Sequence, residues 1–140
     1  MAAGKHIQKF ASIYFRLPDD KLVLQRRTND APNAPGKLGS FGGRVEESEA
    51  AYECLVREIA EETSLNSDVL SIKLVTDFTM PADEVYNFKR HFYIYEARIK
   101  SLDFEVFEGS GAEAYSVEEL RSRDDLTSSA ASTLRYLNSH

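Results

Sequence analysis

Hydrophobic and polar positions alternate in several short segments of the chain, and the pattern predicts strands ahead of the first helix. Residues 7–16 (IQKFASIYFR) are apolar and aromatic, and residues 21–27 (KLVLQRR) alternate after a Pro-Asp turn, so the two segments predict a β-hairpin. Residues 28–36 contain two prolines, two asparagines and a glycine, which indicates a loop. Residues 37–45 then form a short extended piece interrupted by glycines.

A helical pattern follows over residues 48–63, where small and aliphatic side chains recur every three or four positions. Ser48 or Glu47 is expected to cap the start of this helix. Strands are expected at residues 69–79 and 89–100. The shorter expected elements are a strand at 104–107, a helix opening at 116–120 and a final helix at 128–138. This order predicts a mixed α/β domain with helices packed on a curved sheet.

The composition narrows the class of protein. A chain of 140 residues with 42% apolar and 29% charged residues can bury a core of its own, so we expect a single domain over residues 1–140. The one cysteine, Cys54, excludes an intramolecular disulfide framework and a cysteine-based zinc site. A net charge of −6 argues against binding to duplex nucleic acid. No membrane span or signal peptide is recognised, so a cytoplasmic location is expected.

Acidic residues concentrate between positions 46 and 62, where seven of the 23 acids lie. On a helix, Glu58, Glu61 and Glu62 would span only about 100° of the circumference, next to the apolar stripe. Like charges at this spacing repel by roughly a few tenths of a kcal/mol per pair. A hard divalent cation such as Mg²⁺ or Mn²⁺ would relieve the repulsion, and a carbonyl of the Gly42-Gly43 pair could join its coordination. The alternative is an acidic helix face that contacts only water.

The segment 43–65 resembles the Nudix box of the Nudix hydrolase family, G-x5-E-x7-R-E-U-x-E-E-x-G-U, where U is a bulky aliphatic residue. The matching residues are Gly43, Glu49, Arg57, Glu58, Ile59, Glu61, Glu62 and Leu65. Ser64 stands where the box has a glycine, at a helix end that favours the left-handed conformation. We therefore expect the serine to cost about 1 kcal/mol, or the chain to turn at Asn66 instead. Weaker similarity over residues 7–137 implies an α/β/α sandwich with a mixed, curved sheet.

The resemblance also implies an activity: hydrolysis of a pyrophosphate bond in a nucleoside diphosphate linked to another moiety, with Mg²⁺ or Mn²⁺ as cofactor. The ligands implied for the ions are Glu58, Glu61, Glu62, the carbonyl of Gly42 and Glu108. Glu58 is alternatively the residue that orients or deprotonates the attacking water. Glu108 resembles a glutamate of a late loop in some members, where it serves as base or as an extra ligand.

Arg57 is similar to the family arginine that orients the glutamates of the box, a task suited to the two-pronged guanidinium. Glu49 would be its partner or a helper near the ions. Outside the box, Arg26 and Arg27 follow a strand and could hold a phosphate; the alternative is a solvated strand end. Four aromatic residues could stack on a base, although packing in the core is the more frequent use of such side chains. They are Phe78, Tyr86, Phe88 and Tyr93.

Two other functions stay open at this level. One is a non-catalytic, regulatory module that binds nucleotide and metal on the same fold. The other is a structural protein whose acidic helix is merely surface. The expected partner is a small nucleotide-derived substrate; the sequence does not say which nucleotide, and it leaves a homodimer open.

Overall fold

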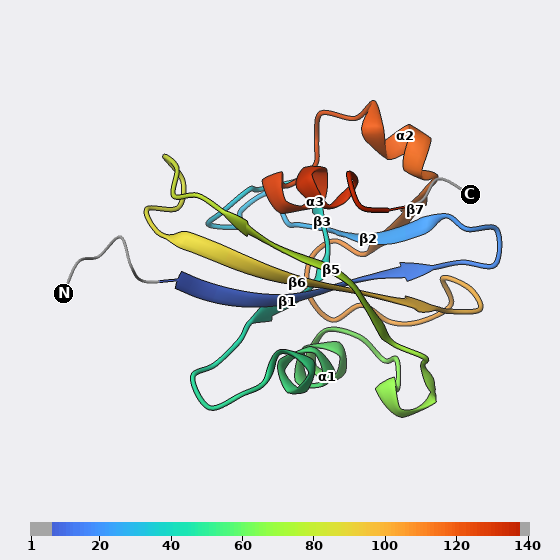
Figure 1. Cartoon of the computed structure of the whole chain (residues 1–140). Coiled ribbons are helices and arrows are strands. Elements are labelled where there is room, and N and C mark those ends of the chain that lie inside the picture. The colour runs from blue at the N-terminus through green and yellow to red at the C-terminus, as the bar shows by residue number, and fades with distance from the viewer. Residues whose placement is uncertain (1–6, 138–140) are drawn as a thin grey trace.

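The computed structural model of the protein describes residues 7–137 and has a mixed, curved sheet between helices. Helix α1 covers one face of this sheet, and α2 and α3 lie on the other (Figure 1). The α/β/α sandwich expected from the sequence is therefore confirmed. The strands are β1 (Ile7–Arg16), β2 (Leu22–Arg26), β3 (Leu38–Gly39), β4 (Phe41–Arg44), β5 (Lys73–Met80), β6 (Lys89–Arg98) and β7 (Ala112–Tyr115). The helices are α1 (Ala51–Glu62), α2 (Val117–Arg121) and α3 (Ser128–Thr133), with a short 3₁₀ turn η2 (Ser67–Val69).

Strand β1 organises the sheet, whose order is β3-β2-β1-β6-β5. It runs parallel to β6 along its whole length, from Ile7 opposite Lys89 to Arg16 opposite Arg98. On its other side, the first half of β1 pairs antiparallel with β4 and the second half with β2. Strand β7 adds to β2. Because β1 has two partners on this side, β4 diverges from the sheet toward α1. The candidate site lies where β4 and α1 approach each other.

Two apolar layers hold the helices to the sheet. Alternate residues of β1 face opposite sides, as the period of two requires. Ala11, Ile13 and Phe15 pack with Leu55 and Ile59 of α1. On the other face, Tyr14 packs with apolar residues of β2, β6, α2 and α3. The helix α1 is therefore fixed by one buried stripe, and its acidic residues lie along the edge of that stripe.

The start of α1 differs from the expectation. The helix begins after Ala50, so the predicted caps Ser48 and Glu47 are wrong. Alanine has no side-chain acceptor, but Glu53 Oε1 accepts the Ala50 N–H at 2.8 Å. One half of a capping box therefore satisfies the first turn, and Glu53 is used for structure.

Three other boundaries were also placed differently by the sequence pattern. The expected strand at 104–107 is reduced to a single antiparallel bridge between Val106 and Thr63. The expected strand at 69–79 begins only at Lys73, because η2 precedes it. The final helix ends at Thr133, and position 138 of that prediction lies outside the described residues. Within residues 7–137, no helix has the length and apolar character needed to cross a bilayer.

Candidate active site

Two adjacent glycines bring β4 into contact with both the sheet and α1. Gly42 has φ +127°, and a Cβ there would overlap the carbonyl oxygen of Ala11 on β1. Gly43 would place a Cβ onto the carboxylate of Glu58. Only glycine gives room for β1, β4 and α1 to approach this closely. The glycine pair therefore fixes the position of Glu58 against the strand.

Glu62 is a buried carboxyl group, with only 2% of its surface exposed. Its Oε1 accepts the Gly42 N–H at 3.1 Å. Burial raises the pKa of Glu62 to about 9, and a hydrogen bond with Glu58 and the negative charges of Glu58 and Glu108 add to the increase. Without a cation, burial and the nearby negative charges therefore favour the protonated form of Glu62.

Arg57 joins the glutamates of the box into one network. Its Nε and Nη2 donate to the two oxygens of Glu49 at 2.8 and 2.9 Å, which is the two-pronged geometry expected for an arginine and a carboxylate. Its Nη1 donates to Glu58 Oε1 at 3.0 Å and to Glu61 Oε1 at 3.3 Å. Arg57, with a smaller contribution from the Glu46 N–H, lowers the pKa of Glu49 to about 2. Glu49 is therefore the ionised anchor that holds Arg57 beside Glu58.

The late loop reaches the end of α1 through its backbone. The Phe107 N–H donates to the carbonyl of Glu62 at 2.7 Å, and Gln25 Nε2 donates to the carbonyl of Glu108 at 2.8 Å. These bonds bring Glu108 close enough for its charge to raise the pKa of Glu62. The backbone of the late loop therefore lies against the end of α1, and the role that the resemblance implies for Glu108 stays a prediction.

The side chains present suit a hard divalent ion. Glu58 and Glu62 offer oxygen ligands, and the raised pKa of Glu62 marks a site where a cation would neutralise negative charge. Glu61 is about half exposed, and its carboxylate pairs with Arg57 at 3.3 Å. Across residues 7–137 no three acidic, histidine or cysteine side chains already surround one point. An ion bound here would favour the ionised form of Glu62.

Ser64 does not adopt the conformation that its place in the box suggested. The helix ends with Thr63 extended at φ −140°. The Ser64 N–H donates to the Glu105 carbonyl at 3.0 Å, and the Glu105 N–H donates to Ser64 Oγ at 2.8 Å. Within the described residues, the non-glycine positions with positive φ are Asp20 and Ala34. The expected penalty at Ser64 is therefore wrong. The chain turns at Asn66 instead, where the side-chain oxygen of Asn66 accepts the Asp68 N–H at 3.0 Å and caps η2.

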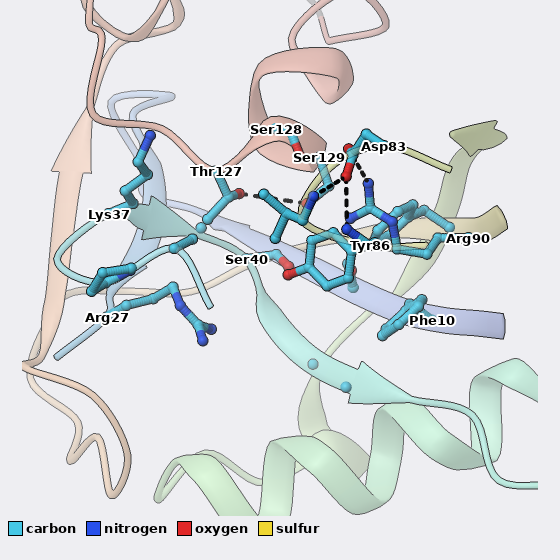
Figure 2. Close-up of a pocket in the computed structure, with 18 residues that line it drawn as sticks. Phe10, Arg27, Lys37, Ser40, Asp83, Tyr86, Arg90, Thr127, Ser128 and Ser129 are labelled. Carbon is cyan, nitrogen blue, oxygen red and sulfur yellow. Dashed lines mark hydrogen bonds and ion pairs between the residues drawn. The ribbon is translucent and has the colours of Figure 1, made fainter. Parts of the chain in front are cut away.

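A pocket of about 530 Å³ opens beside the glycine pair (Figure 2). Gly42 and Gly43 form part of its wall, so the pocket and the carboxylates share β4. Figure 2 shows Arg27 and Lys37 on one side of this space and Phe10, Tyr86 and Arg90 on the other. The pocket therefore has a cationic end and an aromatic end.

The two neighbouring arginines predicted to bind phosphate have different surroundings. Arg26 donates to both oxygens of Glu113 at 2.7 and 2.8 Å and to Asp125 Oδ2 at 2.9 Å. It joins β2, β7 and the segment before α3, and it does not line the pocket. Arg27 does line the pocket, with its Nε held by the carbonyl of Asn33 at 2.8 Å. The structure thus brings Arg27, and not Arg26, to the space beside Gly43.

The aromatic residues predicted to stack on a base also have different surroundings. Phe78 packs between Phe92 and Tyr136, as a core residue would. Tyr86 lines the pocket, and its ring lies 3.8 Å from the guanidinium carbon of Arg90. The sequence analysis overlooked Arg90. The signal was present, because Arg90 occupies an inward position of a strand otherwise filled by apolar residues.

Comparison with known proteins shows the family and the fold. The NUDIX domain family model matches residues 7–137. Among solved structures, the MutT protein from Methanosarcina mazei is 18% identical, with a TM-score of 0.79 over 96% of this chain and 94% of that one. The E. coli dihydroneopterin triphosphate pyrophosphohydrolase is 15% identical, with a TM-score of 0.71 over 91% and 92%. The NUDIX domain of Shewanella oneidensis NrtR, solved with ADP ribose, is 16% identical, with a TM-score of 0.72 over 94% and 86%.

Proposed function

Since the chain belongs to the Nudix domain family and is a pyrophosphohydrolase of that type, we propose that it uses Mg²⁺ or Mn²⁺ to hydrolyse a nucleoside diphosphate linked to another moiety. The observation that carries the proposal is the pair of the buried Glu62 and the half-buried Glu58 beside the pocket wall formed by Gly42 and Gly43. A paired buried carboxyl is unfavourable without a cation. A nucleotide in the pocket would present its phosphates next to that pair.

Each side chain then has a defined task. Glu62 and Glu58 would hold the cation, with Glu61, the Gly42 carbonyl and Glu108 as further ligands. A bound divalent ion neutralises charge on the diphosphate oxygens and acidifies water.

Proton transfer from water has two candidate acceptors, Glu58 and Glu108. Glu58, whose carboxylate is held in one position by Arg57 and Gly43, would accept the proton only if it does not also bind the cation. Otherwise Glu108, which is exposed on a loop, would be the acceptor. Arg57 acts as the positioning residue for Glu58, and Glu49 fixes Arg57 in turn. Arg27 and Lys37 attract the substrate's outer phosphates.

The substrate is a small nucleotide derivative. Similar folds include one solved with ADP ribose and one that is a dihydroneopterin triphosphate pyrophosphohydrolase, so the moiety beyond the diphosphate differs among relatives. A cytoplasmic location and a homodimer stay predictions from the sequence.

A hydrolysis panel tests the proposal. Nucleoside triphosphates, nucleotide sugars, ADP-ribose and dinucleoside polyphosphates are incubated with the protein in Mg²⁺, Mn²⁺ or EDTA, in water enriched in ¹⁸O. We expect cleavage of at least one compound, abolished by EDTA, with the label in a phosphate product. Nucleotide binding without turnover would instead support the regulatory module. A protein whose melting temperature responds to neither metal nor nucleotide would support the structural alternative.

A further inference from the structure

Arg90 is a buried cation in the pocket wall with an unused hydrogen-bond donor. Only 3% of the residue is exposed, and its Nε–H has no acceptor within the part of the chain that the structure describes. The strand register places Gln8 of β1 and Met80 of β5 on either side of it. A buried donor left without a partner is unfavourable, so its persistence in a pocket wall points to an acceptor supplied by a ligand.

The neighbours of Arg90 fix its position but do not accept all of its hydrogen-bond donors. Asp83 Oδ2 lies 3.4 Å from Nη2, longer than a strong charge-assisted bond. The other oxygen of Asp83 already accepts the N–H groups of Val85 and Tyr86 at 2.8 and 2.7 Å. The ring of Tyr86 lies 3.8 Å from the guanidinium carbon, and that of Phe92 lies 5.6 Å from it. The rings of Tyr86 and Phe92 therefore hold the guanidinium in place. Its Nε–H has no acceptor among the described residues.

The two ends of the pocket suit the two parts of a nucleotide. Phosphates are attracted to Arg27, Lys37 and the cation held by the carboxylates. At the other end, Figure 2 shows Phe10 and Tyr86 on the same side of the space as Arg90, and these two rings provide an aromatic wall for a flat ring. A base is thus the part of the ligand that reaches Arg90.

We propose that Arg90 determines base specificity by donating from Nε and Nη2 to O6 and N7 of a 6-oxopurine, the ring of guanine and hypoxanthine. This proposal rests on the proposed function and names its substrate class. Guanine presents two adjacent acceptors on one edge, which match the parallel donors of an arginine. Adenine places a donor beside N7 and offers no such pair.

Binding requires a small rearrangement. Arg90 Nε is fully covered in the structure, and Asp83 and Tyr86 lie in the connection between β5 and β6 that covers it. This connection must shift for a base to reach the guanidinium edge. Arg90 Nη2 then exchanges its long contact with Asp83 for a hydrogen bond to the base. The base also replaces part of the cover that the Tyr86 ring provides.

The test is metal-free binding of four nucleoside monophosphates, measured by calorimetry in EDTA. Guanosine and inosine monophosphates carry both O6 and N7, whereas adenosine and 2-aminopurine riboside monophosphates lack O6. We expect the first two to bind at least about tenfold more tightly. Arg90→Lys keeps the charge but removes the paired donors, so it should abolish the difference. Lys89→Gln, on the exposed neighbour, should retain the preference.

Equal affinities for the four compounds, no measurable binding of any, or a preference that survives in a folded Arg90→Lys protein would each overturn the proposal. If Arg90→Lys does not fold, as its melting curve would show, the selectivity of the unaltered protein decides. The two proposals fail separately. Preference for 6-oxopurines without hydrolysis of any anhydride contradicts the proposed activity alone, and hydrolysis without base preference contradicts the role of Arg90 alone.

Discussion

Gly43 lies directly against the carboxylate of Glu58, so that a single added methyl group would overlap it. This contact joins Gly43, the first residue of the Nudix box, on β4, to Glu58 on α1, the residue proposed to act at the site. Gly43 is therefore required for packing against the Glu58 side chain, whereas Gly42 is required by its own φ of +127°. Gly42 and Gly43 are thus required for different physical reasons.

Gly43→Ala should destabilise the fold by about 1–3 kcal/mol, because overpacking must displace Glu58 or β4. The same substitution in a Glu58→Ala background should cost much less, since the overlapping carboxylate is gone. Urea unfolding of the four proteins of this double-mutant cycle measures the coupling. Equal costs in both backgrounds would show that the two residues do not press on one another.

Arg57→Lys should lower kcat by roughly 10- to 100-fold with little change in fold stability. A lysine cannot hold Glu49 and Glu58 together, so Glu58 loses its fixed position. Arg44→Lys is the matched control, because Arg44 is exposed on the neighbouring strand. Steady-state kinetics at saturating Mg²⁺ provide the measurement. If both variants turn over alike, Arg57 has no positioning role.

The metal-free protein should lose stability as the pH rises from about 5 to 9. The folded-state pKa of Glu62 is raised to about 9, above its ordinary value of 4.5. In that window the folded state keeps a proton that the unfolded state has released, so stability falls by at most about 1.4 kcal/mol per pH unit. Glu49, with its pKa lowered to about 2, changes its contribution below this window.

Urea unfolding in EDTA across pH 5–9 measures this effect, with Glu62→Gln for comparison. A glutamine cannot ionise, so the variant should show a much flatter dependence on pH. Saturating Mg²⁺ should reduce the loss in the unaltered protein, because the cation favours the ionised carboxylate. Identical pH profiles for the two proteins in EDTA would refute the assignment of the slope to Glu62.

Ser64→Gly, which restores the residue of the family pattern, should destabilise this protein by about 1 kcal/mol. The substitution removes the bond from the Glu105 N–H to Ser64 Oγ and loosens an extended segment. Ser64→Ala separates the two effects, since it removes the hydroxyl and keeps the Cβ. Thermal melting of the three proteins tests the prediction, and a stabilised glycine variant would mean that the segment prefers a left-handed turn.

The fold could be predicted from local patterns wherever one face of an element is buried. β1 and α1 each bury one face against the other. This burial produces the period of two in β1 and the apolar stripe of α1, and both patterns are visible in the sequence. Failures occurred where a distant segment decides the local structure. Thr63 and Ser64 are extended because residues 105–107 pair with them. At the start of α1 the reason is local: the helix begins after Ala50 because Glu53, rather than a side chain at position 47 or 48, bonds to the Ala50 N–H.

The site was predictable to the extent that its residues lie on one helix. Spacing places Glu58, Glu61 and Glu62 on one edge, but it cannot tell that Glu62 is buried under Gly42 while Glu61 turns outward to Arg57. The aromatic end of the pocket could not be predicted in this way. Arg90 meets Tyr86 only because β6 and the connection before it fold back onto β1.

The central claim is that Glu58 and Glu62 hold the divalent ion needed for hydrolysis. The most direct measurement is calorimetric titration of Mn²⁺ into the unaltered protein and into the Glu58→Gln/Glu62→Gln variant, combined with the hydrolysis rate of each. The account predicts that the variant binds Mn²⁺ at least about tenfold more weakly and loses turnover by about 10³-fold or more. A folded variant that binds Mn²⁺ as tightly as the unaltered protein and hydrolyses its substrate at the same rate would contradict it.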